Sequence, residues 1–220
     1  MSDRLLVFVK APRPGAVKTR LAAVLGDEAA AGLYRAIAGE EIRRTAPRAG
    51  EYDRVFFFAP EDARPDIERW LPGETLEPQQ GIDLGQRMSR AFTSAFDAGA
   101  RRVAIIGTDV PAAGREHVME ALRSLDDHDV VLGPTHDGGY YLLALDRPRP
   151  ALFQSIPWST PSVLPATAER AGVLGLSVRM LDPLRDIDTF DDLRAEWPRL
   201  RPLVAGTPFE ALVTKWMPER

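Results

Sequence analysis

The sequence predicts an α/β fold of three layers, in which helices cover both faces of a mixed, mainly parallel sheet. Short apolar runs alternate along the chain with longer segments whose apolar residues recur every three or four positions, a pattern typical of β-α-β units. Two of the runs, Val103–Ile106 and Val130–Leu132, are apolar at consecutive positions, as strands buried on both faces are. No internal repeat or long linker interrupts the alternation, so residues 1–220 are predicted to form one domain.

Six strands are expected from the apolar runs. The first run follows directly on Met1–Arg4 and is too short for the apolar core of a signal peptide, so we interpret it as a buried strand. The remaining runs are bounded by glycine, proline or charged residues, as strands are. The expected strands are Leu5–Val9, Arg54–Ala59, Arg102–Gly107, Asp129–Gly133, Tyr140–Leu145 and Val178–Leu181.

The helices are predicted from apolar stripes. One continuous helix is expected over Thr19–Thr45, a second ends near Gly99, and a third lies around residues 118–125. The C-terminal segment is helical by the same criterion, and we expect it, with Trp197 and Trp216, to form a cap packed against the sheet. The stripe residues are Leu21, Leu25, Leu33 and Ile37, then Leu84, Met88, Phe92 and Phe96, then Val118, Leu122 and Leu125.

Composition limits the classes of function. The formal net charge of -4 gives no electrostatic reason to expect a nucleic-acid partner. No apolar run approaches the roughly 20 residues that span a bilayer, so no membrane partner is expected and the cytoplasm is the expected location. The chain has no cysteine, which excludes disulfides and thiolate metal sites. Any metal must therefore be bound by oxygen or imidazole.

A loop suited to phosphate binding follows the first expected strand. A glycine-containing loop that leaves a strand and opens a helix offers unpaired backbone N–H groups to an anion. Lysine and arginine side chains add full charges, and arginine can bind a phosphate through two hydrogen bonds. The loop matches neither a Walker A motif nor a dinucleotide motif, and a solvated basic loop is the alternative interpretation. The loop residues assigned to nucleotide or phosphate binding are Lys10, Pro12, Gly15, Lys18 and Arg20.

Acidic residues follow two of the expected strands. Asp109 lies where a buried strand emerges, a place suited to hold Mg²⁺ or Mn²⁺ together with phosphate oxygens, although an aspartate before Pro111 can also simply begin a turn. Asp186 and Asp188 are two residues apart and would face the same side of an extended segment. Two such carboxylates repel unless a cation lies between them, which favours a second metal ligand. The alternative is that Asp188 or Thr189 caps the following helix.

A third polar segment precedes the strand that begins near residue 140. Gly138 and Gly139 permit the close approach of a ligand or of another backbone, and a bulge or tight turn is the alternative. The three histidines, His117, His128 and His136, show no spacing suited to zinc, so we interpret all of them as surface residues.

Taken in order, these segments resemble a bacterial family of DUF2064-type glycosyltransferases with the GT-A, nucleotide-diphospho-sugar transferase fold, a family linked to arsenosugar biosynthesis. More distantly, the layout is similar to 2-phospholactate guanylyltransferase and molybdopterin-cofactor guanylyltransferase. The matching segments span residues 8 to about 193. They are Phe8–Pro12, Gly15–Leu21 with its Lys18-Thr19-Arg20, Leu84–Met88, Ile106–Pro111, Leu132–Leu142, Trp158–Thr160 and Asp186–Thr189.

The resemblance implies a role for individual residues and a divalent metal, Mg²⁺ or Mn²⁺, as cofactor. Val110 stands where family members often have a cysteine, which leaves the preceding carboxylate unchanged. The implied roles are catalysis for Lys18, Arg20 and Asp137, nucleotide or phosphate binding for Lys10, Pro12, Gly15, Lys18, Arg20, Gly85 and Arg87, the acceptor side for Gly138, Gly139 and Trp158, and metal binding for Asp109 and Asp188.

Two enzyme classes and one binding class are compatible with these observations. The family resemblance favours glycosyl transfer from a nucleoside-diphosphate sugar to a small-molecule acceptor. The cationic loop favours nucleotidyl transfer from a triphosphate with release of pyrophosphate, and the isolated Asp109 lacks the Asp-x-Asp form of many glycosyltransferases. The third class is a nucleotide-binding module without catalysis.

Overall fold

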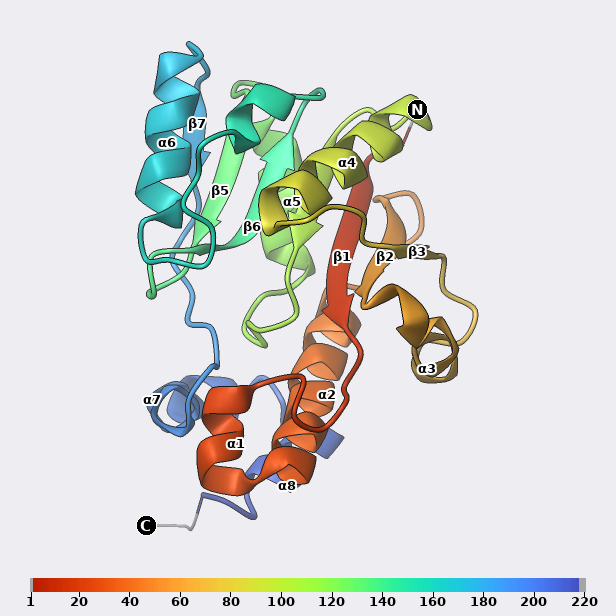
Figure 1. Cartoon of the computed structure of the whole chain (residues 1–220), viewed down its shortest axis with the longest axis vertical. Coiled ribbons are helices and arrows are strands. Elements are labelled where there is room, and N and C mark those ends of the chain that lie inside the picture. Colours follow the sequence, from red (N-terminus) through yellow and green to blue (C-terminus); the bar gives the residue numbers. More distant parts are fainter. Residues whose placement is uncertain (1, 218–220) are drawn as a thin grey trace.

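A computed structural model gives the structure of residues 2–217 (Figure 1). Its centre is a seven-stranded sheet of strand order β3-β2-β1-β4-β6-β5-β7. Only β6 runs antiparallel to its neighbours, β4 and β5, so the predicted mixed and mainly parallel sheet is confirmed. The strands are β1 (Arg4–Lys10), β2 (Asp53–Ala59), β3 (Leu76–Pro78), β4 (Val103–Ile106), β5 (Val130–Pro134), β6 (Tyr140–Leu145) and β7 (Val178–Met180).

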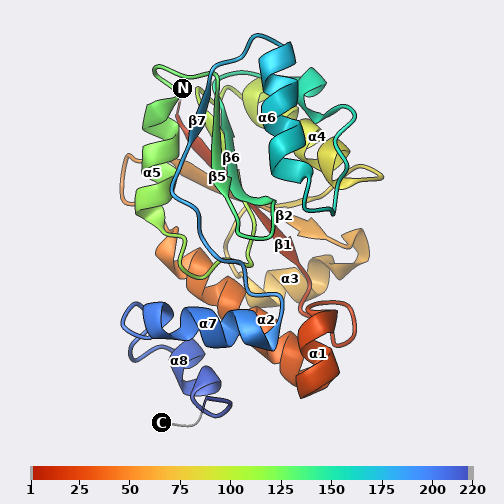
Figure 2. The ribbon, with the colours of Figure 1, turned by 90° about the vertical axis from the view of Figure 1, so that its left-hand side faces the viewer.

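Helices cover both faces of this sheet. Figure 2 shows the sheet between α5 on one side and α4 and α6 on the other. None of the helices within residues 2–217 is long and apolar enough to cross a bilayer. The helices are α1 (Thr19–Leu25), α2 (Asp27–Arg44), α3 (Arg64–Trp70), α4 (Leu84–Asp97), α5 (Arg115–Ser124), α6 (Val163–Val173), α7 (Phe190–Leu200) and α8 (Pro208–Val213), with 3₁₀ turns at Glu61–Ala63 and Pro150–Phe153.

Successive side chains of β1 point to opposite faces of the sheet, which explains why helices pack on both faces. Leu5 and Val7 point into the apolar core shared with α2 and α5, whereas Leu6 points into the core shared with α4. All three side chains are fully buried. Because burying such a side chain contributes about 1.5–3 kcal/mol, a strand that is apolar on both faces stabilises helices on both faces.

The helix expected over Thr19–Thr45 is broken, which corrects the prediction. Gly26 separates α1 from α2 and adopts φ 82°, a left-handed value that favours glycine. Its N–H donates to the carbonyl oxygen of Ala22, and its own carbonyl accepts from the N–H of Ala30. Gly26 therefore closes one helix and opens the next while the apolar stripe continues, so periodicity did not reveal the break.

The C-terminal helices form the expected cap, but α8 packs on α2. Trp197 of α7 meets Phe209 of α8 edge to face, with ring centroids 6.3 Å apart. Phe209 and Val213 are buried in the core on the α2 side of the sheet. The cap thus extends that core beyond the sheet, where α2 projects past the end of β1 (Figure 1).

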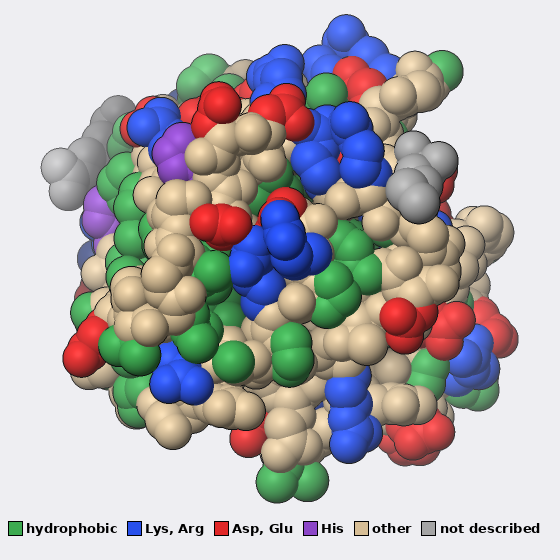
Figure 3. Space-filling model, turned by 90° about the horizontal axis from the view of Figure 1, so that it is seen from above, with side chains coloured by type: hydrophobic (Ala, Val, Ile, Leu, Met, Phe, Trp, Pro, Cys, Tyr) green, Lys and Arg blue, Asp and Glu red, His purple; other side chains and the backbone are tan. Residues whose placement is uncertain are grey.

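Charged side chains at the end of the molecule where β1 begins form ion pairs. Figure 3 shows this end, with lysine and arginine beside aspartate and glutamate over the visible face. The buried carboxylate of Asp3 accepts hydrogen bonds from the guanidinium groups of Arg101 and Arg102, the shortest at 2.6 Å. These pairs join the start of β1 to the start of β4. The candidate site lies at the opposite end of the sheet.

Candidate functional site

A cavity of about 660 Å³ opens at the carboxyl ends of β1 and β4. The two strands are adjacent and parallel, so the segments that follow Lys10 and Ile106 emerge at the same edge of the sheet. Open α/β sheets bind their ligands at this edge. The cavity brings together six of the residues that the sequence singled out: Lys10, Lys18, Arg20, Arg87, Asp109 and Asp188.

Lys18 lies between the two predicted metal ligands. Its Nζ atom is 2.5 Å from Oδ1 of Asp109 and 2.8 Å from Oδ1 of Asp188. The Lys18 side chain is 4% exposed, whereas the two carboxylates are 49% and 40% exposed. Burial opposes the ammonium charge, but the charges of Asp109 and Asp188 outweigh it and raise the pKa of Lys18. The two carboxylates therefore share one cation, and that cation belongs to the chain itself.

The backbone around Lys18 explains its position. Val17 is buried against α2, in a small cluster with Ala31, Tyr34 and Ala38, and this anchors the loop. Lys18 then adopts φ 49° and ψ 45°, a left-handed conformation that is rare for lysine. The side chain turns from the anchored loop toward the carboxyl end of β4. The sequence indicated the charge of Lys18 but not this direction.

The structure excludes one of the two roles left open for Asp188, that of a helix cap. Thr189 is the N-cap of α7, because its hydroxyl accepts from the N–H of Asp192 (3.1 Å) and the Asp192 carboxylate accepts from the N–H of Thr189 (2.8 Å). Asp188 has no part in this capping box. Its carboxylate faces Lys18 instead, where burial raises and the Lys18 charge lowers its pKa, with a net lowering.

Three further cations surround the paired carboxylates. Lys10 is exposed at the end of β1. An Nη atom of Arg20 is 3.7 Å from Oδ2 of Asp188, and the Arg20 side chain is 74% exposed. Arg87 of α4 donates from Nε to the carbonyl oxygen of Gly81 (3.1 Å), which fixes its position at the cavity wall. The cavity therefore presents exposed positive charge around two carboxylates that share one ammonium.

Buried polar groups of α2 form hydrogen bonds to the segments that carry the site. The Tyr34 hydroxyl accepts from the N–H of Lys10 (2.9 Å) and is 3.0 Å from Oγ1 of Thr108. Glu41 accepts from the N–H of Val110 (2.9 Å), and burial raises its pKa well above the ordinary range. Sequence reasoning missed Glu41. The available signal was its place four residues after Ile37 on the apolar stripe, where a carboxyl group needs a buried partner.

The predicted acceptor-side loop is a tight turn. Oδ1 of Asp137 accepts from the hydroxyl of Thr135 (2.6 Å) and from the N–H of Gly139 (2.9 Å). Gly138 has φ 91°, and a Cβ atom there would lie 2.1 Å from the carbonyl oxygen of Pro161. The turn interpretation therefore accounts for the two glycines, and none of residues 137–139 lines the cavity at β1 and β4.

Other predicted residues lie apart from this cavity. A Cβ atom at Gly85 would lie 2.4 Å from Nε1 of Trp158, so the glycine makes room for the indole. Both line a neighbouring cavity of about 470 Å³. Pro12 lines a smaller hollow near α3, and Gly15 adopts φ 75° in the loop. Gly85 therefore has a packing role in this structure.

His117 corrects the prediction that all three histidines lie on the surface. Its side chain is 18% exposed, and its Nδ1 atom accepts from the N–H of Gly114 (3.1 Å). The ring meets Tyr141 edge to face with centroids 5.9 Å apart. His117 therefore belongs to the start of α5 and its packing.

Asp186 is the third carboxyl group of the segment that carries Asp188. Burial raises the pKa of Asp186 to about 6, and the charges of Asp137 and Asp188 act in the same direction. The sequence placed Asp186 and Asp188 on the same side of an extended segment. Lys18 neutralises only the second of them by direct contact.

The carboxylates of Asp109 and Asp188 fit a divalent metal that also binds phosphate. Within residues 2–217 no group of three or more histidine, aspartate or glutamate side chains is arranged to hold a metal. Mg²⁺ is usually bound by one or two carboxylates together with water and substrate phosphates, rather than by an all-protein cage. Two half-exposed carboxylates beside exposed cations match that requirement.

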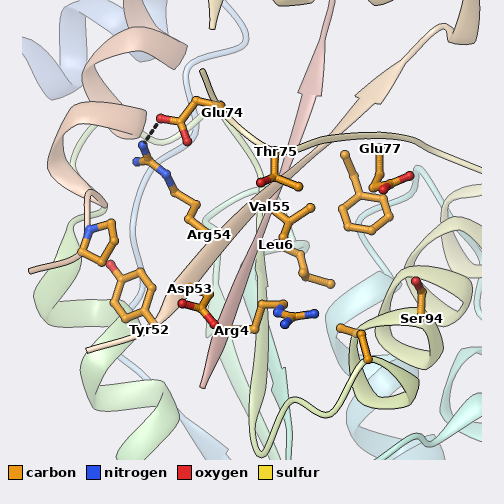
Figure 4. A pocket seen from close by; sticks show the side chains of 14 residues that line it. Arg4, Leu6, Tyr52, Asp53, Arg54, Val55, Glu74, Thr75, Glu77 and Ser94 are labelled. Carbon is orange, nitrogen blue, oxygen red and sulfur yellow. Dashed lines mark hydrogen bonds and ion pairs between the residues drawn. The ribbon is translucent and has the colours of Figure 1, made fainter. Parts of the chain in front are cut away.

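A second cavity of about 620 Å³ lies near the start of β1 and β2. Figure 4 shows Arg54 in this cavity joined to Glu74, and their shortest N–O distance is 2.5 Å. The second cavity contains none of the residues predicted for function. It also lies away from the carboxyl ends of the parallel strands, so the cavity at β1 and β4 is the candidate active site.

Several known protein structures share this fold. A crystal structure from Desulfovibrio desulfuricans G20, provisionally assigned as a nucleotide-diphospho-sugar transferase, matches with a TM-score of 0.90 at 36% identity over 98% of this chain and 95% of the other. The inositol-1-phosphate CTP transferase of T. maritima matches with a TM-score of 0.57 at 16% identity, over 94% and 98%. The manganese complex of Rv0371c from Mycobacterium tuberculosis H37Rv matches with a TM-score of 0.52 at 13% identity, over 89% and 97%.

The two matches at low identity show a shared fold alone. No curated protein sequence matches the chain. The family model described as "uncharacterized protein conserved in bacteria" (DUF2064) matches residues 42–160, which include β4 and Asp109. With this match and the 36% identity to the D. desulfuricans protein, the chain belongs to the DUF2064 family and has the nucleotide-diphospho-sugar transferase fold.

Proposed function

We propose that the cavity at the carboxyl ends of β1 and β4 is the active site of a metal-dependent transferase that uses a nucleotide donor. The observation that carries the proposal is the convergence of Asp109 and Asp188 on one ammonium, beside the exposed cations Lys10 and Arg20. The assignment of the D. desulfuricans protein and the fold it shares with a CTP transferase support a nucleotide donor.

Asp109 and Asp188 would hold Mg²⁺ or Mn²⁺ in this proposal, and the manganese complex of a protein with the same fold supports that choice. A bound divalent metal supplies charge neutralisation for the phosphates of the donor. Lys10, Lys18 and Arg20 would bind the remaining phosphate oxygens. Cations positioned before the reaction stabilise the charge that develops on a leaving phosphate group, which is usually the largest contribution to catalysis.

The first candidate reaction is glycosyl transfer from a nucleoside-diphosphate sugar. The oxygen of an acceptor hydroxyl forms a bond to the anomeric carbon and gives up its proton to solvent, the bond from that carbon to the phosphate oxygen breaks, and the nucleoside diphosphate leaves with the electron pair of the broken bond. In this proposal Arg20 and Lys18, which both line the cavity, would stabilise that charge. The assignment of the D. desulfuricans protein, at 36% identity, supports this candidate. Asp137 and Trp158 stay predictions for the acceptor side.

The second candidate reaction is nucleotidyl transfer from a nucleoside triphosphate. The acceptor attacks the α-phosphorus and pyrophosphate leaves. Four cationic side chains at one cavity, Lys10, Lys18, Arg20 and Arg87, favour this alternative because a triphosphate carries more charge than a diphosphate sugar.

A thermal-shift panel tests the proposal at the level common to both candidates. We expect at least one nucleoside-diphosphate sugar or nucleoside triphosphate to raise the Tm in the presence of Mn²⁺ and to raise it much less when EDTA is added. The proposal is wrong if nucleotides of all common bases leave the Tm unchanged with and without Mn²⁺.

A further inference from the structure

We infer that Lys18 is an exchangeable internal cation. Its ammonium lies between Asp109 and Asp188 until a metal, bound together with a nucleotide, takes that position, and the ammonium then binds the nucleotide phosphates. This inference rests on the proposed function. Metal binding and nucleotide binding are then mutually dependent.

The geometry requires an exchange. The ammonium contacts Oδ1 of both Asp109 and Asp188, at 2.5 and 2.8 Å. A divalent metal bound by the same oxygens would lie about 2.1 Å from them, so it would be a close neighbour of Nζ and would compete with it for the same two oxygens. Two cations this close repel strongly in a half-buried site. Metal bound by both carboxylates therefore displaces the ammonium.

The Lys18 side chain can move without disturbing the core. Lys18 is the N-cap of α1, and its carbonyl oxygen accepts a hydrogen bond from the N–H of Ala22 (2.9 Å), so its backbone is held independently of the side chain. The anchor of the loop is the neighbouring Val17, which stays buried against α2. The lysine side chain is flexible over four carbons, so Nζ can swing from the carboxylates into the cavity.

The displaced ammonium needs a new partner. Metal alone would deprive Lys18 of both contacting carboxylates, in a cavity that already contains Lys10 and Arg20. A nucleotide brings phosphate oxygens that bind both the metal and the ammonium. Metal and nucleotide should therefore bind with positive cooperativity, and linkage requires that each raises the affinity for the other by the same factor.

Mn²⁺ binding measured by electron paramagnetic resonance tests the exchange without reference to activity. The variants are Lys18→Gly, which suits the left-handed backbone, and Lys18→Met, which keeps the length of the side chain. We expect each variant to bind Mn²⁺ alone about ten-fold or more tightly than the wild-type protein, because a charge-assisted contact no longer competes. A nucleoside diphosphate should then raise Mn²⁺ affinity less in either variant than in the wild type.

Two control variants separate this inference from the proposed function. Arg20→Met removes a cation that is 3.7 Å from Asp188 but 74% exposed, and it should change the affinity for Mn²⁺ alone only slightly. Asp109→Asn should abolish tight binding in every background. Folded Lys18 variants that bind Mn²⁺ no more tightly than the wild type, while Asp109→Asn still abolishes binding, would overturn the exchange alone. Mn²⁺ binding that is insensitive to Asp109→Asn would overturn the metal site, and the exchange with it.

Discussion

The backbone N–H of Ile187 donates a hydrogen bond of 2.9 Å to the carbonyl oxygen of Asp109. This bond joins the end of β4 to the segment that precedes α7, and it places Asp188 one residue from the contact. The neighbouring segment is tied to β5 as well, because the N–H of Leu184 donates to the carbonyl oxygen of Pro134 (3.0 Å). The two carboxylates therefore meet through backbone pairing, and Lys18 joins two segments that are already fixed.

Arg20 provides a test of the phosphate-binding loop. Because charge-assisted hydrogen bonds contribute about 1.5–3 kcal/mol, Arg20→Ala should weaken the binding of a nucleoside diphosphate about ten-fold or more. It should barely change the binding of the nucleoside alone. Isothermal titration calorimetry with both ligands measures the difference, and equal losses for the two would indicate a structural role.

Arg13→Ala is a matched control for Arg20→Ala, since Arg13 lies in the loop that leads into α1, the helix that carries Arg20. Its guanidinium forms ion pairs of 3.0 Å with Asp62 and Asp66 instead of facing the cavity. We expect its replacement to lower the Tm slightly and to leave diphosphate affinity unchanged. A comparable loss of affinity in both variants would show that the loop acts through its general charge.

Asp186 predicts a pH-dependent stability. Its pKa is raised to about 6 by burial first and then by Asp137, from an ordinary value of 3.8. Between these two values the folded state binds a proton that the unfolded state does not, so the free energy of unfolding contributed by this group falls as the pH rises through that window. Above it, the ionised Asp186 costs stability.

Asp186→Asn should therefore stabilise the protein at pH 8 by about 1–2 kcal/mol, after allowance for partial exposure, and stabilise it much less at pH 4. Urea unfolding at the two pH values measures the change. An equal change at both would mean that the pKa of Asp186 is not raised in the folded protein.

Gly138 tests whether residues 137–139 form a structural turn. Gly138→Ala should lower the free energy of unfolding by about 1–3 kcal/mol, because its Cβ atom would overlap the carbonyl oxygen of Pro161. Gly32→Ala on the exposed side of α2 meets nothing within 4 Å and should be neutral or stabilising by up to about 1 kcal/mol. Similar effects of the two substitutions on urea unfolding would refute the tight-turn assignment.

Local patterns were sufficient to predict the sheet. The six expected strands end within one or two residues of six observed ones, because β1, β4 and β5 are buried on both faces and their apolar runs are continuous. Shorter elements gave too little signal. The strand Leu76–Pro78 is three residues long and exposes Glu77, and the helix Arg64–Trp70 has seven residues with one buried, so neither shows a periodic stripe.

The sequence was sufficient to predict which residues belong to the site but not which of them contact one another. Asp109 followed from its place at the end of a buried strand, and Lys18 from its charge in a glycine-containing loop. The ion pair between Lys18 and Asp188 joins residues 170 positions apart, and no local pattern encodes such a pairing. The left-handed backbone of Lys18 was equally hidden, because lysine rarely adopts it.

The nature of the donor separates the two candidate reactions. With Mn²⁺ present, we expect a nucleoside-diphosphate sugar to raise the Tm more than the matching triphosphate at equal concentration, because the sugar adds contacts within the cavity. The alternative is favoured if the triphosphate raises the Tm more and pyrophosphate is released when an acceptor is added. Coupled detection of pyrophosphate and of free nucleoside diphosphate distinguishes these outcomes directly.

Thermal denaturation of Asp109→Asn shows whether Asp109 links nucleotide binding to a divalent metal. A ligand at 100 times its Kd stabilises a protein by about 2.7 kcal/mol, so the wild type with nucleotide should gain a clear increase in Tm on addition of Mn²⁺. Asp109→Asn should fold and lose that increase, whereas Asp191→Asn, which changes an 89% exposed carboxylate on α7, should retain it. An equal Mn²⁺-dependent increase in all three proteins would mean that Asp109 does not hold the metal.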